Sequence, residues 1–194
     1  IACSDWNALQ VAEYDLPEEG ANPDRDSPEA INVEWISLNY QESGTFPDVD
    51  VTSAPVPCFH CENPVCRDAG PENGVYKRDE DGLVFVEQSN LNESQSQAVA
   101  DACPYDRIQI PDRDMPASSG YPDGKPAGMA TKCTGCFDRD GGPACADACP
   151  IGAIEFGDIE ELQSEHPDAD REPLKELYGA DAVEETQPAV IYES

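Results

Sequence analysis

The chain has 194 residues, enough for one large or two small domains, and carries 41 acidic against 11 basic residues, a net charge of −30. This balance excludes nucleic acid as a partner, because binding to a phosphate backbone requires Lys and Arg. No apolar run is long enough to cross a bilayer, so we expect no transmembrane segment in these residues.

The first half of the chain contains one predicted loop and one predicted hairpin. Residues 15–32 are acidic and rich in Pro, which predicts a long loop. The runs VEWISLNY and GLVFVEQ are rich in aromatic and β-branched residues and indicate that the chain folds despite its charge. Residues 75–86, with Asp81 and Gly82 at the turn, predict a β-hairpin.

The second half begins with another long loop. Residues 111–130 are rich in turn formers, and loops of that length are usually functional or disordered. Asp158 and Glu161 predict a capping box at the start of a short helix that reaches Leu162. Residues 188–192 predict a closing strand.

Cysteine is the most informative residue type in this chain. The nine cysteines are an odd number, which does not suit a closed set of disulfides, and several lie three positions apart. A CxxC loop brings both of its sulfurs to one centre, so each group of cysteines predicts a metal site with three or four thiolates. The two groups are Cys58, Cys61 and Cys66, and Cys133, Cys136, Cys145 and Cys149.

Two kinds of metal centre suit such groups. Paired CxxC motifs are typical of structural zinc sites, which are the first alternative. However, the sequence Ala-Cys-Pro occurs at both Cys103 and Cys149, and Cys-Pro ends the bacterial ferredoxin motif CxxCxxCxxxCP. Proline there stops a helix and turns the chain into a strand, and apolar runs at 108–110 and 153–156 fit such strands. The pattern favours iron–sulfur clusters over zinc, and either over a disulfide scaffold.

The motifs also occur in a recognisable order. The runs CFHCENPVC, YKRDEDGLVFV, ACPYD, TKCTGCFDR and CADACPIGAIEFGDIEEL resemble the iron–sulfur (beta) subunits of dimethyl sulfoxide (DMSO) reductase-family molybdoenzymes. The opening ACSDWNAL resembles the end of the first cysteine motif in the same subunits, including those of formate dehydrogenases. The resemblance covers nearly the whole chain. It implies an α+β fold with two ferredoxin-like lobes of the bacterial dicluster type, long acidic loops and, in a full family member, a row of four cubane clusters.

The resemblance further implies how the ligands are shared, because the fourth cysteine of each motif completes the cluster of its lobe partner. Motifs two and three share the lobe at 58–110. One [4Fe-4S] cluster in it would take Cys58, Cys61, Cys66 and Cys103. The other would need thiolates at four positions that lack them: Gly70, Glu93, Ser96 and Val99. We therefore predict that one cluster has been lost whole beside a complete neighbour.

Motifs one and four pair in the other lobe, at 1–57 and 130–194, and residues 111–129 form the connecting loop. A second [4Fe-4S] cluster would take Cys133, Cys136, Cys145 and Cys3. Cys149 would complete a third cluster with ligands upstream of Ile1, so the first motif is either truncated or lost, and we favour truncation. A lone buried thiol is the alternative for Cys149.

The function implied by the resemblance is electron transfer. The chain, itself non-catalytic, would relay electrons between a membrane quinol-oxidising or haem subunit and the molybdopterin catalytic (alpha) subunit of a respiratory reductase for DMSO or trimethylamine oxide (TMAO). The complex would be peripheral to the membrane, on its extracytoplasmic face. The rival interpretations are a beta subunit of a formate dehydrogenase or of a thiosulfate, polysulfide or tetrathionate reductase, a free-standing polyferredoxin, and a zinc-stabilised structural module.

Four residues near the cysteines carry weaker expectations. His60 lies inside the first CxxC loop, where it would either donate a hydrogen bond to a sulfur or be a plain loop residue. Trp6 follows Cys3 and is expected to cover its cluster. Lys132 and Arg139 flank the second CxxC loop, where surface placement without a role is favoured over offsetting cluster charge or docking a partner.

The acidic composition predicts that the fold depends on salt. Only four Lys occur, and a surface of this charge repels itself in dilute buffer but is screened within a few Å at about molar salt. We expect a halophilic protein that loses structure when the salt is removed. Circular dichroism recorded from molar salt down to dilute buffer tests this, and an unchanged spectrum would contradict it.

Overall fold

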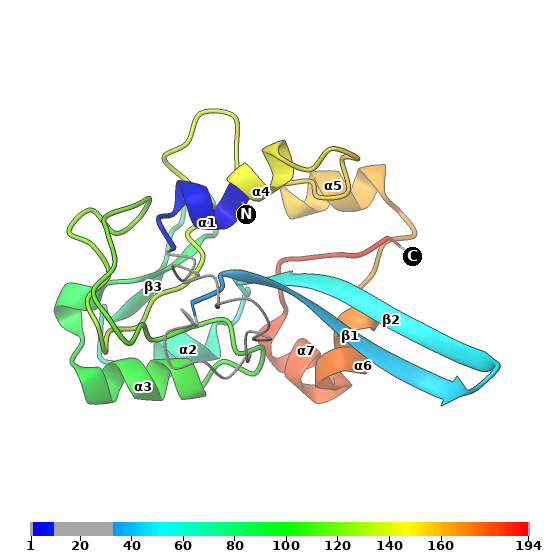
Figure 1. The fold of residues 1–194 in the computed structure, drawn as a ribbon, viewed down its shortest axis with the longest axis horizontal. Helices are drawn as coiled ribbons and strands as arrows, with labels where there is room; N and C mark the ends of the chain where they lie inside the picture. The colour runs from blue at the N-terminus through cyan, green and yellow to red at the C-terminus, as the bar shows by residue number, and fades with distance from the viewer. Residues whose placement is uncertain (1, 10–32, 194) are drawn as a thin grey trace, which may run out of the picture.

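The structure is a computed structural model that describes residues 2–9 and 33–193, so the predicted loop at 15–32 lies outside the described residues. Its elements are short and mixed, with two two-stranded sheets and small helices around them (Figure 1). In chain order they are α1 (Ala2–Trp6), β1 (Ile36–Thr45), β2 (Asp48–Pro57), α2 (Val65–Asp68), β3 (Val75–Lys77), β4 (Val84–Val86), the 3-10 helix η1 (Gln88–Asn90), α3 (Glu93–Asp101), α4 (Ala144–Asp147), α5 (Ile159–Glu165), α6 (Glu172–Tyr178) and α7 (Ala180–Thr186). None of these helices is long and apolar enough to span a bilayer.

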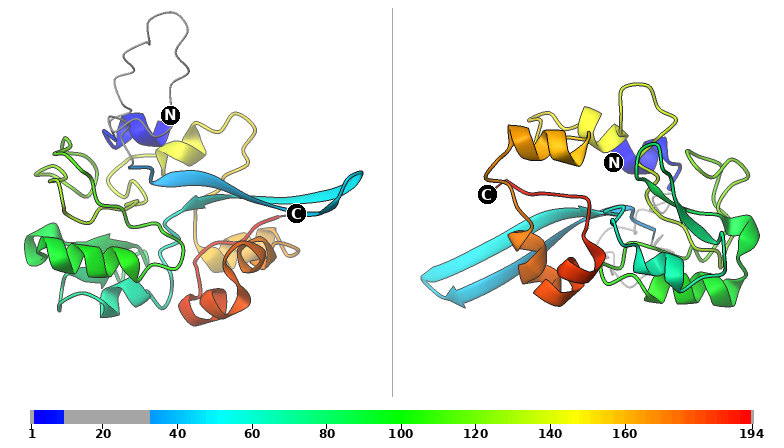
Figure 2. Two further views of the ribbon diagram at one scale, coloured as in Figure 1. Left: turned by 60° about the horizontal axis from the view of Figure 1, so that its bottom comes forward. Right: turned by 180° about the vertical axis from the view of Figure 1, so that it is seen from behind.

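A long antiparallel hairpin of β1 and β2 projects from the body of the molecule (Figures 1 and 2). Successive strand residues point to opposite faces, and one face buries Ala54 and Val56 against α6 and α7. The other face leaves Leu38 and Tyr40 exposed, at 69% and 67%. The sequence analysis did not predict this hairpin, because polar residues interrupt the apolar alternation along both strands.

Two predicted elements are confirmed. The hairpin at 75–86 forms as β3 and β4, with Val75 opposite Val86, and Gly82 in its turn has a φ of +69°, which Gly adopts without strain. The predicted helix forms as α5 with Asp158 as its N-cap, but the return hydrogen bond from the Glu161 side chain that would complete the capping box is not among those of the described residues. The carboxylate of Asp158 accepts hydrogen bonds from the first-turn N–H groups, and the helix continues beyond Leu162.

Three predicted strands are wrong. Residues 153–156 have no regular structure, and the runs at 108–110 and 188–192 each make one isolated bridge, through Gln109 and Tyr192. A strand requires an extended neighbour along its length, and each of these two runs meets one at a single residue only. Ile108 is nevertheless buried, so side-chain packing rather than a sheet explains its apolar character.

The predicted loop at 111–130 is confirmed, because it contains no helix or strand, but it packs against the rest of the protein. Backbone bridges join Met115 to Lys125 and Ser118 to Tyr121. The side chains of Met115 and Tyr121 are buried with Trp35, whose ring centroid lies 5.6 Å from that of Tyr121. This segment is therefore part of the hydrophobic core.

The polar run ESQSQAVAD forms the regular helix α3. Asn92 caps it, and the side chains of Asn92 and Gln95 make the reciprocal hydrogen bonds of a capping box. Ser96 and Val99 lie on its buried face, while Glu93 is exposed. Three of the four predicted positions of the lost cluster therefore belong to an ordinary amphipathic helix.

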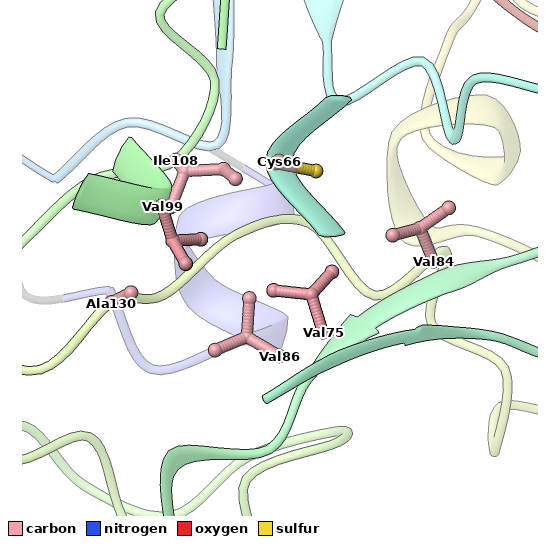
Figure 3. Packing of buried hydrophobic residues seen from close by; sticks show 7 residues of the cluster. All are labelled: Cys66, Val75, Val84, Val86, Val99, Ile108 and Ala130. Atoms are coloured by element: carbon pink, nitrogen blue, oxygen red, sulfur yellow. The ribbon is translucent and has the colours of Figure 1, made fainter. Parts of the chain in front are cut away.

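Aliphatic side chains fill the space beside this helix. Val99 of α3 points toward Val75 and Val86 of the small hairpin, and all three are buried (Figure 3). Gly70, the fourth predicted position, lies so close that a Cβ built on it would be 2.9 Å from Val99 Cγ2. Contacts between aliphatic side chains therefore fill the space between α3, Gly70 and the small hairpin.

This contact yields a stability prediction. Gly70→Ala is expected to lower the midpoint of thermal unfolding, because overpacking of this kind costs about 1–3 kcal/mol. In combination with Val99→Ala, the loss should be smaller than the sum of the two single losses, since the shorter side chain makes room for the new methyl group. Unfolding of the parent, both single variants and the double variant in the same molar salt measures this, and strictly additive losses would show that the two positions do not interact.

Candidate metal centres

Four cysteines that are distant in the sequence line one small cavity, and we call them the Cys58 site: Cys58, Cys61, Cys66 and Cys103. The first two lie in the loop after β2. Cys66 lies in α2, which begins after Pro64, and Cys103 follows the end of α3. Three segments of the chain therefore converge to make this site.

The lining of this cavity is free of acidic residues. The chain contains 41 of them, yet the described residues around the cavity are cysteines and apolar, neutral polar or basic side chains, such as Phe59, Ile108 and Arg107. Because no carboxylate of the described residues lines this cavity, an anionic group can bind there without repulsion from acidic side chains. An iron–sulfur cluster held by four thiolates is such a group.

The spacing of the sulfur atoms also argues against a single ion. All nine cysteines are among the described residues, and no three of their sulfurs lie within 4.8 Å of one another. Four sulfurs that bind one zinc ion at about 2.3 Å would be about 3.8 Å apart. The sulfurs are therefore too far apart to bind a single zinc ion together, whereas in an iron–sulfur cluster each thiolate binds a different iron.

The thiols of the Cys58 site interact with one another through burial and charge. Burial, and then the neighbouring Cys58, raise the pKa of both Cys61 and Cys66 to about 12. The same two causes raise the pKa of Cys103, opposed by the backbone N–H of Arg107, which donates to its sulfur at 3.4 Å. Because iron binds thiolates, cluster assembly at this site must release protons.

A second group of four cysteines, which we call the Cys133 site, combines Cys3 with Cys133, Cys136 and Cys145. Helix α1 carries Cys3 against α4, which carries Cys145 (Figure 1). The side-chain amide of Asn7 donates to the sulfurs of Cys3 and Cys136, at 3.7 Å each. Burial, followed by Cys145 and Cys136, raises the pKa of Cys3 to about 12. The start of the chain and the fourth motif therefore meet, as the predicted ligand set requires.

Cys149 has the same backbone geometry as Cys103. The N–H of the residue four positions later donates to each sulfur, Ala153 to Cys149 at 3.3 Å and Arg107 to Cys103 at 3.4 Å. The residue three positions later has a positive φ in both turns, +64° and +53°. The N–H donors, that of Ala153 first, lower the pKa of Cys149. The Ala-Cys-Pro sequence thus builds the same thiolate-stabilising turn twice.

Comparison with known proteins shows the family to which this chain belongs. Residues 49–159, more than half of the chain, match the family model described as a 4Fe-4S dicluster domain. A sulfite dehydrogenase subunit of Allochromatium vinosum is 31% identical over 180 residues, which cover 88% of this chain and 67% of that protein. This protein belongs to the iron–sulfur subunits of the DMSO reductase family.

Two further relatives carry names from the same family. A chain of the anaerobic dimethyl sulfoxide reductase of Escherichia coli is 35% identical over 117 residues, covering 58% of this chain and 49% of that protein. A putative dimethyl sulfoxide reductase iron-sulfur subunit of Halobacterium salinarum is 33% identical over 140 residues, covering 69% and 52%. The chain therefore spans about half the length of several of the relatives that it matches.

In His60 of this iron–sulfur subunit, one ring nitrogen is hydrogen-bonded and the other has no partner among the described residues. Its Nδ1 accepts the backbone N–H of Val84 at 2.8 Å, so the ring proton is on Nε2. Burial, and then the charge of Lys132, keep the pKa of His60 well below its usual value. Nε2 is buried and has no partner among the described residues, and His60 lines the cavity of the Cys58 site. A neutral donor is thus available to a sulfur, the first of the two predicted roles.

Two other expectations are wrong. Lys132 was expected at the surface, but its side chain is buried, because its stem packs in the protein and its ammonium group donates to backbone carbonyls. Trp6 was expected to cover a cluster, but it is 49% exposed, with the Arg139 guanidinium 5.2 Å from the ring centroid. Its neighbour Asn7 is the residue that turns inward to the sulfurs.

The sequence analysis also missed three residues around the two sites. Asn7 could have been found, because it lies four positions after Cys3, directly after the end of α1, where one helical turn separates the two residues. Thr186, whose hydroxyl interacts with the Cys61 thiol, is too distant in the sequence to be found by spacing. Arg107 is buried, and its guanidinium donates to carbonyl and hydroxyl oxygens from three segments.

The Cys58 site predicts a definite loss of iron. In the full-length protein, Cys103→Ser is expected to remove one cluster, about four irons. Ser96→Ala, at one of the predicted lost-ligand positions, is the matched control and should retain all the iron. Iron analysis of the parent should give about twelve irons for three clusters. A parent with about sixteen irons, or a Ser96→Ala variant that lost iron, would contradict the loss of the fourth cluster.

Proposed function

We propose that this protein relays single electrons through two [4Fe-4S] clusters bound by the described residues and a third in the full protein. The Cys58 site holds the first cluster and the Cys133 site the second. Cys149 supplies one ligand to the third, together with cysteines upstream of Ile1. The clusters supply the one-electron chemistry when bound, and the chain positions them, excludes water from them and tunes their potentials.

The observation that carries this proposal is the pair of thiol-lined sites in close proximity. The Cys58 site lines a cavity without carboxylates, and its sulfurs are too far apart to bind a single zinc ion together. Cys58 is close enough to act on the pKa of Cys133, which burial chiefly raises. Two buried one-electron carriers side by side are what a relay needs.

The fourth cluster of the family pattern is absent from this proposal. Glu93, Ser96 and Val99 lie in a regular helix, and Gly70 packs against Val99. Aliphatic side chains occupy the space between these positions. Both observations support a lobe in which one cluster has been replaced by hydrophobic packing, so that the relay is shorter at that end.

We further propose that the partners are a molybdopterin catalytic subunit and a membrane quinol-oxidising or haem subunit, in a complex on the extracytoplasmic face. The relatives are named as parts of reductases and dehydrogenases. The outer face of the β1–β2 hairpin, with Leu38 and Tyr40 exposed, supports a subunit rather than a free-standing polyferredoxin, because exposed apolar arrays mark contact surfaces.

The substrate that we propose is an oxide such as DMSO or TMAO. Two of the relatives described above are named for DMSO reductase. The second candidate function is that of a dehydrogenase or of a sulfur-compound reductase. It is supported by the match to a sulfite dehydrogenase subunit, which is the longest of the three matches described above. No residue of this chain distinguishes these substrates, because an electron relay need not contact them.

The direct test is reoxidation of the clusters in the isolated complex. The complex is purified in molar salt, reduced with a limiting amount of dithionite and mixed with DMSO or TMAO while the visible absorbance of the clusters is followed. We expect bleached clusters to recover with an oxide. Recovery with only tetrathionate, thiosulfate or polysulfide, or bleaching by formate, would replace the proposed substrate with the corresponding alternative. A chain that purifies alone would be a polyferredoxin, and a colourless one would contradict the relay itself.

A further inference from the structure

Lys132 lies between the two candidate cluster sites. It directly precedes Cys133, and its Nζ donates to the carbonyl of Cys133 at 2.8 Å and to the carbonyl of Val84. The N–H of the same Val84 donates to His60, inside the CxxC loop of the Cys58 site, at 2.8 Å. The backbone of Val84 and the ammonium group of Lys132 therefore link the first CxxC loop to the second.

This ammonium group is buried without a carboxylate. Lys132 is 1% exposed, and none of the ion pairs in the described part of the chain includes it. The chain has 41 acids and four Lys, so partners of opposite charge are abundant at the surface. Buried charges are normally paired, and a cation kept away from so many carboxylates indicates an anion of another kind.

A second buried lysine shows the contrast. The Nζ of Lys125 has three oxygen acceptors, the carbonyls of Asn7 and Pro116 and the hydroxyl of Ser118, which match its three N–H donors. Lys132 has two carbonyl acceptors, so one donor remains. The hydrogen bonds of Lys125 therefore satisfy its buried ammonium group completely. Those of Lys132 leave one N–H donor without an acceptor in the described part of the chain.

The charge of Lys132 acts on both sites. Its ammonium opposes the burial that raises the pKa of Cys133 in one site and the burial and thiol repulsion that raise the pKa of Cys66 in the other. The charge of Cys58 also contributes to raising the pKa of Cys133. The sites thus approach each other around this one cation.

We propose that Lys132 is a positioning residue whose buried positive charge is shared by the clusters of the Cys58 and Cys133 sites and raises the reduction potentials of both. Each cluster is anionic and gains one further negative charge on reduction, so a nearby cation stabilises the reduced form more than the oxidised form. The low polarity of the surroundings strengthens this effect. The hydrogen bonds of the same ammonium group also fix the position of one CxxC loop relative to the other. This inference rests on the proposed clusters.

The test is a redox titration of the full-length protein in molar salt, with the reduced clusters followed by electron paramagnetic resonance. Lys132→Met keeps the length of the side chain and removes the charge, and we expect it to lower the midpoint potentials of both clusters. Lys132→Arg keeps the charge and should leave the potentials near those of the parent. Lys175→Met removes an exposed lysine and is the matched control, expected to change neither potential.

The outcomes separate this inference from the proposed function. A parent without iron would contradict the clusters themselves. Full iron content in Lys132→Met with unchanged potentials would overturn the role of Lys132 and leave the relay standing, as would equal shifts in the Met and Arg variants. If Lys132→Met assembles too little iron to titrate, Lys132→Gln, which retains hydrogen-bond donors without the charge, takes its place. Loss of the clusters from both neutral variants but not from Lys132→Arg would support the requirement for a cation.

Discussion

The structure depends on the convergence of sulfur atoms from segments that are distant in the sequence. The Cys58 site needs the loop after β2, the helix α2 and the turn after α3 to meet, and the Cys133 site needs the start of the chain to meet the fourth motif. The elements are short, β2 ends at Pro57 directly before Cys58, and α2 and α4 begin after Pro64 and Pro143, which makes this convergence geometrically easy. They also leave the hydrophobic core divided into three small clusters, two of which include cysteine among their buried residues.

Charge is sorted between the surface and the interior. The acidic residues dominate the exposed surface, while three of the 11 basic residues, Arg107, Lys125 and Lys132, are buried. None of the three is in an ion pair within the part of the chain that the structure describes. Arg107 and Lys132 lie beside the cysteine sites, where thiolate-bound iron would supply the missing negative charge. The few cations of an acidic protein are thus placed where the anionic clusters would need them.

Under the proposed function, the region of Gly70, Glu93, Ser96 and Val99 would be one in which a cluster has been lost while its neighbour remains. A cluster is at once a cofactor and a packing element, so its removal leaves a space that must be refilled. A capped helix and the side chain of Val99 fill this region, and Gly70 permits their close approach. Cys103 follows the same helix and remains in the neighbouring site. The helix that carries three of the proposed lost positions therefore also positions Cys103, a proposed ligand of the neighbouring cluster.

The sequence by itself determined the two cysteine groups, the small hairpin at 75–86 and the cap at Asp158, because each depends on local spacing or on short-range turn and capping chemistry. The assignment of Cys103 and Cys3 to these groups came from the family resemblance, since neither lies near its group in the sequence. The sequence did not determine the β1–β2 hairpin, the failed strands after Cys103 and Cys149, or the buried positions of Lys132 and Asn7. Those depend on which distant segments pack together. Whether a lysine lies at the surface or between two cysteine sites is decided by the fold around it, and a cysteine motif alone carries no record of that environment.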